Sequence, residues 1–433
     1  MARTPPTPQF GEPWWHSQTS VVAGAKLEGD QRCDVVVVGG GVAGLHAALR
    51  LSACGADVVL LERDICGGGM SGRSSGFLTP DSELGLHQLM GRFGAAEAAT
   101  LWRIAADGAA LIVDTARAEA IACDLQSVDC LFVGIGESGA TTIRAEAEAR
   151  AAVGFDYQLM DEPSLAAVHP GGYQAGLAYG DTEAADPFAY CRGLRDVLIE
   201  RGVQVYEGSP VTAIEGSAVV TERATVHADR VVVCLDRMPP SINARASEQI
   251  YHAQTVLCVS EPLSAVQIAA LFPRGRFQVW DSTAVYSYYR LTGDDRLLLG
   301  GGSALTTFAR DPLRSPGVIR AVIRGFRARF PDLGGLRFTR WWPGLIDVTR
   351  DLLPVIDADP EEPTVQYVFG CAGLPWAAWG GDHAARRIMT PGTEDLTRFF
   401  GWSREALVPS GLQGLLGKPL SFAIDILDAR RVP

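Results

Sequence analysis

Three glycines and one acid near the start of the chain have the types and spacing needed to hold two phosphates and a ribose. Gly39, Gly41 and Gly44 form the pattern G-x-G-x-x-G, and Glu62 follows them. In this pattern the first glycine allows a tight turn, the second lets a pyrophosphate approach the backbone, and the third lets a helix pack closely on a strand. An acid on the order of 20 residues downstream accepts hydrogen bonds from ribose hydroxyls. These four residues therefore predict a dinucleotide site.

The segments around these residues predict the elements that would position them. Val35 to Val38 form an apolar, β-branched run that is typical of a strand covered on both faces. After the glycines a helix begins with Val42 and Ala43, and its free N–H groups suit phosphate oxygens. Glu62 ends a second apolar strand. A glycine turn that binds nothing is the alternative, but strand, turn, helix, strand and acid all occur in the expected order.

A glycine- and serine-rich segment follows the second strand, from Ile65 to Pro80. Arg73 and the hydroxyls of Ser71, Ser74 and Ser75 lie within it. In a tight backbone these groups suit contacts to an anion or to the edge of a flavin ring. A flexible linker is the alternative interpretation. We favour a segment that faces a ligand.

The charge balance argues against nucleic acid as a partner. The chain of 433 residues has 38 Lys and Arg against 50 Asp and Glu, a formal net charge of −12. Such a charge repels phosphate backbones and anionic lipid surfaces. The nine cysteines are scattered without a C-x-x-C pattern, which is typical of a reducing compartment and predicts a cytoplasmic protein. No run approaches the ~20 apolar residues of a membrane span, and no cluster has the spacing of metal ligands.

Patterns further along the chain predict a second kind of architecture. The length favours two or three domains. A helical pattern runs from about Leu84 to Ala118. From about Ile250 to Gly302 short strands alternate, and Gly293 to Asp295 marks a hairpin turn. This part of the chain predicts an antiparallel sheet.

Other segments predict a return to the first architecture. Asp186 to Arg201 has a helical period, and His227 to Asp236 resembles another strand buried on both faces. Tyr367 to Met389 combines an apolar strand, a glycine loop and a helix. A strand, loop and helix so far from the first such unit indicates a nucleotide domain assembled from separated segments.

Several motifs taken together resemble one family. The chain is similar to the FAD-dependent amine oxidoreductases of the D-amino-acid oxidase superfamily, and most closely to the gamma-glutamylputrescine oxidases. The resemblance covers nearly the whole length. The matching motifs are DVVVVGGGVAGL with Glu62, SGRSSGF from Ser71, EGSPVTAI around Val211, YYRLTGDDRLLLGGG from Tyr288, and W-x-G-x-x-x-x-T-x-D-x-x-P carried by Trp342, Gly344, Thr349, Asp351 and Pro354.

The resemblance implies an α/β fold with a Rossmann-like FAD-binding domain in discontinuous segments and an α+β substrate-binding domain with an antiparallel sheet. After an N-terminal arm at 1–31, the FAD-binding domain is expected at 32–85, 186–248 and 336–433, and the substrate-binding domain at 86–185 and 249–335. The residues expected to bind FAD are Gly39, Gly41, Val42, Ala43, Gly44, Glu62, Arg63, Ser71, Gly72, Arg73, Ser74, Ser75, Gly76, Val211, Gly344, Gly373, Leu374 and Pro375.

The chain departs from the family pattern at the last flavin motif, where G-x-S-G-H-G becomes the sequence from Gly370 to Pro375. Leu374 replaces the histidine and Pro375 the last glycine, which removes a polar group and a backbone N–H near the flavin ring. Some members attach flavin through a cysteine near the W-x-G segment, but here no cysteine lies between Cys258 and Cys371. FAD is therefore expected to bind non-covalently, with Cys371 as a small buried apolar residue.

The residues predicted to contact the substrate are aromatic or cationic. Trp376 and Trp379 would wall the pocket and hold a cation, or would pack the start of a helix. Tyr288 and Tyr289 are neighbours in a strand, so at most one of them faces the flavin. Arg290 would pair with a substrate carboxylate, or serve as a scaffold residue. The predicted walls are Trp280, Tyr286, Tyr288, Tyr289, Trp376 and Trp379, and the predicted catalytic residues are Tyr289, Arg290, Trp376 and Trp379.

The resemblance implies oxidation of a C–N bond in a small amine or amino acid. A hydride would pass to flavin N5, the resulting imine would hydrolyse, and oxygen would be the acceptor. One alternative is an FAD dehydrogenase that passes electrons to a quinone or carrier protein, with the apolar stretch 419–431 as a docking or membrane-surface helix. Another alternative is a non-catalytic flavin-binding subunit, which the altered loop at Leu374 and Pro375 suggests.

Overall fold

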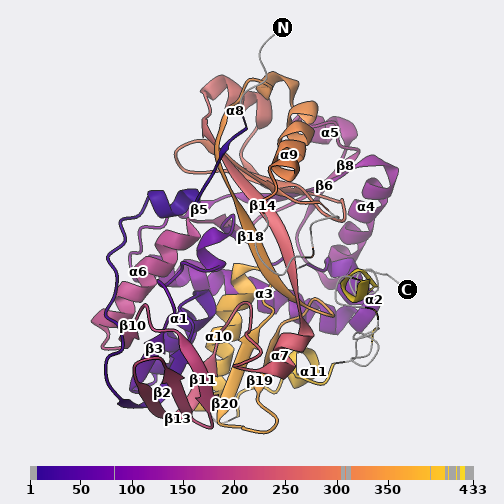
Figure 1. The fold of residues 1–433 in the computed structure, drawn as a ribbon. Coiled ribbons are helices and arrows are strands. Elements are labelled where there is room, and N and C mark those ends of the chain that lie inside the picture. The colour runs from indigo at the N-terminus through magenta and orange to yellow at the C-terminus, as the bar shows by residue number, and fades with distance from the viewer. Residues whose placement is uncertain are drawn as a thin grey trace.

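A computed structural model of the chain describes residues 7–81, 83–303, 308, 314–390, 392–404, 408, 416 and 420–424. These residues form two large sheets with helices packed around them, together with a three-stranded sheet. In Figure 1 the mostly parallel sheet lies at the bottom and the mostly antiparallel sheet at the top. The long strands β14 (Ile250–Pro262) and β18 (Phe338–Thr349) pair with each other and extend from one part to the other.

The first sheet is built on strands that are apolar on both faces. β2 (Gln31–Val38) pairs in parallel with β3 (Val58–Leu61) on one side and with β13 (Thr225–Val233) on the other. Alternate valines of β2 face two different cores, which explains the continuous β-branched run. The sheet also contains β10 (Gln204–Tyr206), β11 (Val211–Glu215), β12 (Ala218–Thr221), β19 (Val355–Ala358) and β20 (Val365–Phe369).

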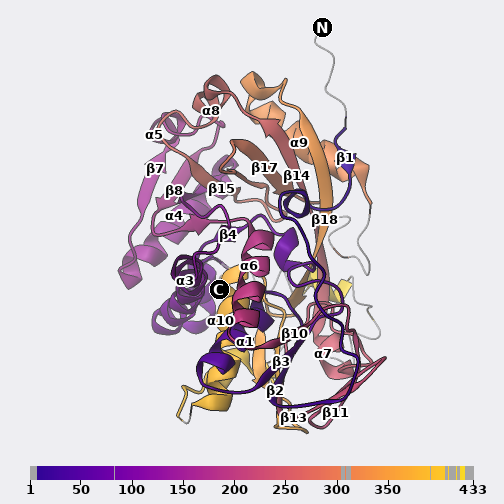
Figure 2. The same cartoon turned by 90° about the vertical axis from the view of Figure 1, so that its left-hand side faces the viewer.

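Close-packed helices cover one face of this sheet. α1 (Val42–Ala53) packs on α10 (Leu374–Met389), which in turn packs on α3 (Ala95–Ala118). A Cβ on Gly381 of α10 would lie 1.9 Å from a carbonyl oxygen of α1, and one on Gly108 of α3 would lie 2.1 Å from a carbonyl oxygen at the start of α10. Glycine is therefore needed where the helices touch. α6 (Pro187–Glu200) lies beside α1 in Figure 2.

The second sheet has the strand order β1-β18-β14-β17-β16-β15-β6-β8-β7. Its remaining strands are β1 (Gln9–Phe10), β6 (Asp129–Gly134), β7 (Gln158–Asp161), β8 (Ala175–Tyr179), β15 (Phe277–Asp281), β16 (Tyr288–Leu291) and β17 (Arg296–Gly301). The helices of this part are α4 (Gly136–Val153), α5 (Glu162–Ala166), α8 (Ala265–Leu271) and α9 (Pro316–Arg329).

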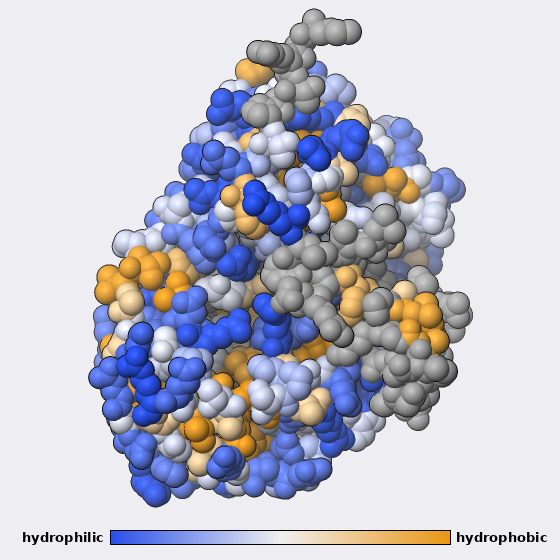
Figure 3. All heavy atoms as spheres, in the orientation of Figure 1, coloured by the Kyte–Doolittle hydropathy of each residue, from blue (hydrophilic) through white to orange (hydrophobic). Residues whose placement is uncertain are grey.

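Short elements join the two parts. The three-stranded sheet consists of β4 (Phe77–Leu78), β9 (Glu183–Ala184) and β5 (Gln126–Ser127). The short helices are α2 (Leu86–Phe93), α7 (Ala244–Gln249) and α11 (Thr397–Phe400). On the face seen in Figure 3, hydrophilic side chains are interspersed with small apolar groups.

The predicted α/β class is confirmed, and two local predictions can be compared directly. The hairpin between β16 and β17 forms where it was expected, with Asp295 at a φ of 64°. The helical pattern predicted from about Leu84 to Ala118 forms two helices rather than one continuous helix. Gly94 has a φ of 81°, which an α-helix does not accommodate, so the chain forms α2 and α3 on either side of it.

The predicted division into domains stays a prediction, and it does not follow the sheets at every strand. β18 was expected in the FAD-binding range 336–433, but it pairs with β14 in the second sheet. Of the C-terminal stretch 419–431, residues 419 and 425–431 lie outside the described residues. In the described part, Phe422 packs edge-on against Tyr251 at a ring distance of 5.3 Å. Within the described residues, no helix combines the length and the apolarity that crossing a bilayer requires.

Candidate active site

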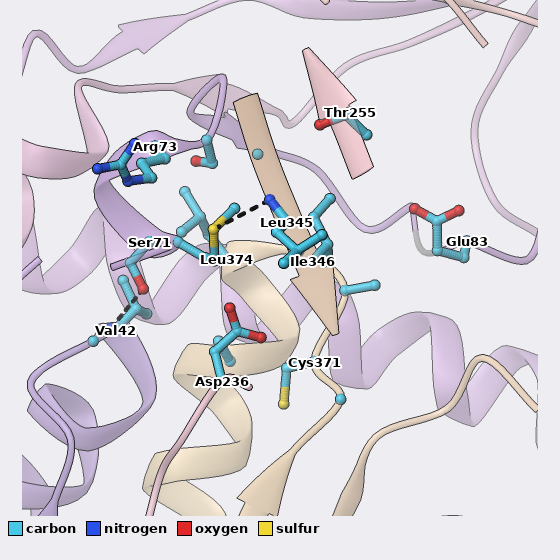
Figure 4. Close-up of a pocket in the computed structure, with 18 of the residues that line it drawn as sticks. Val42, Ser71, Arg73, Glu83, Asp236, Thr255, Leu345, Ile346, Cys371 and Leu374 are labelled. Carbon is cyan, nitrogen blue, oxygen red and sulfur yellow. Dashed lines mark hydrogen bonds between the residues drawn. The ribbon is translucent and has the colours of Figure 1, made fainter. Parts of the chain in front are cut away.

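A cavity of about 1210 Å³ lies between the two sheets. Its volume exceeds the range of about 300–1,000 Å³ that is common for small-molecule sites. The first sheet contributes the carboxyl ends of β13 and β20 and the starts of α1 and α10, and the second contributes residues of β14, β15, β16 and β18. Figure 4 shows side chains from both parts directed into this space. The cavity therefore has room for a long ligand and a second, smaller molecule.

The turn between β2 and α1 forms one end of the cavity. Gly39 has a φ of 108°, and a Cβ there would lie 2.2 Å from the carbonyl oxygen of Cys234. A Cβ on Gly44 would lie 1.8 Å from the carbonyl oxygen of Gly39. A side chain at either position would push α1 away from the sheet. Gly44 thus packs behind the wall, while the wall itself includes Gly39, Gly41, Val42 and Ala43.

Glu62 is held at the adjacent strand end by two backbone donors. Its Oε2 accepts a hydrogen bond from the N–H of Gly40 at 2.7 Å, and its Oε1 accepts one from the N–H of Asp64 at 2.9 Å. Burial raises the pKa of Glu62 above its usual value. Because a carboxylate has about four lone-pair sites, the two bonds orient the group and leave acceptor capacity. Glu62 and Arg63 both line the cavity.

The serine-rich segment is anchored rather than free. Three long side chains donate hydrogen bonds to its carbonyl oxygens: Trp15 Nε1 to Ser74 (2.9 Å), Trp342 Nε1 to Arg73 (3.0 Å) and Arg290 Nε to Ser75 (2.7 Å). The hydroxyl of Ser71 accepts the N–H of Val42 at 3.0 Å, which joins the segment to the start of α1 (Figure 4). Ser71, Arg73, Ser74 and Ser75 line the cavity, whereas Gly72 and Gly76 pack behind them.

The start of α10 closes another side of the cavity. Gly373 precedes the helix with a φ of 112°, and Pro375 stands in its first turn. Proline has no N–H, so this helix start offers one donor fewer to a ligand. The other predicted cofactor residues on the wall are Val211, Gly344 and Leu374.

The structure corrects the prediction that Tyr289 and Arg290 contact a substrate. Tyr289 is buried in the core of the second sheet, where its hydroxyl bonds to His169 Nε2 at 2.5 Å and to the hydroxyl of Tyr173 at 3.0 Å. Strand alternation directs the neighbouring Tyr288 into the cavity instead. Arg290 is fully buried and donates to the carbonyl oxygens of Ser75, Ala185 and Leu291. Arg290 is therefore a scaffold residue, and neither side chain lines the cavity.

Trp376 and Trp379 also lie away from the cavity. Both pack against Phe400, with ring distances of 5.7 Å and 5.6 Å, and Trp379 stacks on His383 at 4.5 Å. They point from α10 into the helical core. Of the two interpretations given above, packing at the start of a helix is therefore the one that the structure supports. The aromatic wall consists of the predicted Trp280, Tyr286 and Tyr288, together with Phe77 and Phe132.

The part of the cavity opposite the glycine turn carries carboxylates. We call it the acidic end, and define it by Asp81, Glu83, Glu146 and Asp281, with His87 beside them. Figure 4 places Glu83 on the opposite side of the pocket from Val42. Glu146 caps the start of α2, since it accepts the N–H of His87 at 3.1 Å and pairs with its Nδ1 at 2.7 Å. Asp281 accepts the N–H groups of its own loop, whereas Asp81 and Glu83 each accept a tyrosine hydroxyl.

The electrostatics of the acidic end suit a cation. Burial raises the pKa of Asp81 to about 7, and its carboxyl also accepts the hydroxyl of Tyr179. Burial opposes ionisation of Glu146 too, but the hydrogen bonds of His87 and the nearby charges of His87 and Arg150 hold the pKa of Glu146 below its usual value. Glu83 accepts the hydroxyl of Tyr286 at 3.0 Å. Among the described residues that line this end, none is Lys or Arg, but the buried Arg150 stands behind it, with Nε 3.7 Å from Oε1 of Glu146.

Some wall residues were not predicted. Asp236 follows β13, and its position at the carboxyl end of a parallel strand is the signal that could have indicated it. Asp81 and Glu83 lie in a segment without a motif, so only the packing of α2 and α4 brings them to the cavity. Thr255 of β14 also lines the cavity, but the residue pattern of that strand does not mark Thr255 as a cavity residue.

The donors and shapes along the wall fit FAD. The glycine turn leaves no space for a Cβ, the start of α1 presents N–H groups, and Glu62 stands at the end of the next strand. The anchored serine-rich segment and the start of α10 then border the space between these groups and the acidic end.

Comparisons with known proteins agree with this arrangement. Residues 34–387 match the family model described as FAD dependent oxidoreductase (DAO). The chain is 28% identical to the probable oxidoreductase OrdL of Haemophilus influenzae over 409 residues, which cover 92% of this chain and 91% of that protein. It is 31% identical to the gamma-glutamylputrescine oxidoreductase of Escherichia coli K12 over 332 residues, which cover 74% and 75% of the two chains.

Solved structures share the fold at lower sequence identity. The glycine oxidase of Geobacillus kaustophilus superposes with a TM-score of 0.75 at 19% identity, covering 87% of this chain and 99% of that one. The L-proline dehydrogenase of P. horikoshii superposes with a TM-score of 0.71 at 18% identity, covering 86% and 98%. At this level of identity the comparisons show a shared fold.

Proposed function

Since the chain belongs to the DAO family of FAD-dependent oxidoreductases, we propose that it oxidises a C–N bond in a cationic amine that carries no carboxylate beside the reacting carbon. The observation that carries this proposal is the acidic end of the cavity, which has carboxylates and no Lys or Arg among its described lining residues. An α-amino acid needs a cation for its carboxylate. An ammonium group needs an acid, and Asp81 and Glu83 supply two.

In this proposal FAD lies along the wall from the glycine turn to the serine-rich segment, without a covalent bond. Cys234 and Cys371 line the cavity, and burial raises the pKa of Cys371 to about 12 and that of Cys234 further still. Both thiols are therefore protonated and poor nucleophiles. The residues we assign to FAD are Gly39, Gly41, Val42, Ala43, Glu62, Arg63, Ser71, Arg73, Ser74, Ser75, Val211, Gly344, Gly373, Leu374 and Pro375, with Gly44, Gly72 and Gly76 packed behind them.

Bound FAD would supply the electron acceptor for a hydride from the carbon next to the amine nitrogen. The remaining work falls to side chains of this chain. Asp81 and Glu83 attract the ammonium form of the substrate into the cavity. The aromatic wall of Trp280, Tyr288 and Phe132 excludes water, which favours the neutral amine needed for the reaction. The imine product then hydrolyses in water, and we propose oxygen as the final acceptor.

An anaerobic titration with a panel of amines tests this function. We expect the visible flavin band to bleach with diamines or monoamines, and to bleach much more slowly with glycine or other α-amino acids. Admitting air should restore the band and release hydrogen peroxide. Bleaching without reoxidation by air would indicate a dehydrogenase with another acceptor. Faster bleaching by α-amino acids than by amines would contradict the proposed substrate class.

Replacing Asp81 by asparagine, or Glu83 by glutamine, is expected to raise KM for the best amine about tenfold at pH 8.5, which corresponds to about 1.4 kcal/mol. For Asp81 the effect should depend on pH. Its pKa of about 7 means that the carboxyl is neutral at pH 6 and attracts no cation, so D81N and the wild type should then differ by less than about twofold. Steady-state kinetics at both pH values measure this.

The matched control is D332N, which removes an exposed acid on the surface. It should leave KM unchanged at both pH values, and the flavin content of all variants should equal that of the wild type. An equal rise in KM for D81N at pH 6 and pH 8.5 would show that Asp81 acts through packing rather than charge.

A further inference from the structure

A buried carboxyl group faces the part of the cavity between the starts of two helices. Asp236 follows β13 and lines the cavity together with Val42 of α1 and Leu374 of α10. Figure 4 shows its carboxyl group in the pocket between Val42 and Cys371. Its Oδ1 accepts the N–H of Asp347 at 3.2 Å. Its Oδ2 is buried and has no hydrogen-bond partner among the described residues.

The neighbouring Asp347 decides the charge of this group. Asp347 is almost fully buried, and its carboxylate pairs with His252 Nδ1 at 2.6 Å and accepts the N–H of Arg237 at 2.5 Å. Two adjacent buried carboxyl groups cannot both ionise without a large cost. Asp347 has these donors and Asp236 Oδ2 has none, so the shared proton belongs on Asp236. Burial, together with the Asp347 carboxyl, raises the pKa of Asp236 well above its usual range.

An ionised Asp236 would repel the cofactor that this cavity is built to hold. The start of α1, where phosphates bind, and the start of α10 lie on either side of it. A carboxylate there meets the negative pyrophosphate across a short, buried space, whereas a protonated carboxyl offers an O–H donor to an oxygen acceptor.

We propose that Asp236, as a neutral carboxylic acid kept protonated by Asp347, donates a hydrogen bond from Oδ2 to an oxygen in the ribityl–pyrophosphate portion of FAD. Above the pKa of Asp236, the site must therefore take up one proton when FAD binds. The affinity for FAD therefore depends on pH through Asp236. The charged or titratable groups that face Asp236 are Asp347, Arg237 and Cys371, and His252 acts through Asp347. The proposal concerns cofactor affinity and does not depend on which amine is oxidised.

Titration of the FAD-free protein with FAD, followed by quenching of flavin fluorescence, tests this assignment without any substrate. The wild-type Kd should be constant at low pH and rise about tenfold per pH unit once the pH passes the pKa of Asp236, because binding then requires proton uptake. D236N keeps a donor and cannot ionise, so its Kd should stay within about threefold of the low-pH wild-type value up to pH 9.5. D236L has no donor and should bind FAD more weakly at every pH.

Two further variants separate this role from a purely structural one. D347N removes the neighbouring charge, so the rise in Kd should begin at least one pH unit lower than in the wild type. D332N is the matched surface control and should reproduce the wild-type curve. Melting curves of the FAD-free variants show whether each is folded. Equal Kd values for D236N and D236L across the pH range would overturn the proposal.

Discussion

The substitution Gly44→Ala is expected to weaken FAD binding by about 10- to 100-fold, the equivalent of about 1–3 kcal/mol of overpacking. The reason is steric, since the new Cβ would lie 1.8 Å from the carbonyl oxygen of Gly39 and 3.3 Å from the side chain of Val37. The carbonyl belongs to the backbone and cannot rotate away as a side chain would. α1 would have to move from β2, and its first N–H groups would leave the phosphate position. Fluorescence titration with FAD measures the change.

A glycine on the outside of the molecule provides the control. Gly325 lies within α9, and a Cβ there would meet nothing within 4 Å. Gly325→Ala should therefore leave FAD affinity unchanged and raise the free energy of unfolding by about 0.5–1 kcal/mol, the usual gain for alanine over glycine in a helix. Normal FAD affinity in Gly44→Ala would show that the glycine turn does not determine the position of the cofactor.

Replacing Arg290 by methionine is expected to reduce the free energy of unfolding by about 3 kcal/mol or more, because it leaves buried carbonyl oxygens without donors. The guanidinium group donates to Ser75 at 2.7 Å, to Ala185 at 2.7 Å and to Leu291 at 3.1 Å. Loss of the first bond should also remove one of the three anchors of the serine-rich segment and lower the affinity for FAD. The KM for the amine, measured with saturating FAD, should change little. Chemical denaturation and steady-state kinetics measure the two effects separately.

An exposed arginine that directly precedes β15 provides the comparison. Arg276 pairs with Asp295 at 2.6 Å, and its side chain is 41% exposed. Arg276→Met should change stability by less than about 1 kcal/mol, as is usual for a surface ion pair. The scaffold role of Arg290 would be refuted by a stable Arg290→Met variant that binds FAD normally but binds amino-acid substrates poorly. That result would restore the original interpretation of Arg290 as a carboxylate ligand.

The cofactor part of the site could be predicted from the sequence because its chemistry is local. The glycine turn, the start of α1 and Glu62 lie within one strand–helix–strand unit, so their spacing along the chain is close to their spacing in space. The hairpin at Gly293 was predicted for the same reason. The break between α2 and α3 was missed because the helical period continues on both sides of Gly94, and only the backbone conformation of that glycine separates them.

The substrate part could not be predicted because strand direction and packing decide it. Tyr288 and Tyr289 are adjacent in the sequence, and the pleat sends one into the cavity and the other into the core. Trp376 and Trp379 follow the flavin loop directly, yet α10 turns them towards Phe400. The direction of a side chain relative to a site formed by distant segments is not encoded in a short motif.

The sequence alone thus determined the family, the α/β class and the residues of the dinucleotide turn, because each depends on short-range patterns of apolar residues and glycines. Tertiary structure alone brought Asp81 and Glu83 to the acidic end, placed Asp236 beside Asp347, and made Arg290 a scaffold residue. These contacts join segments that are more than 100 residues apart or lie on different sheets. Their physical cause is the packing of two sheets around one cavity, which no local spacing expresses.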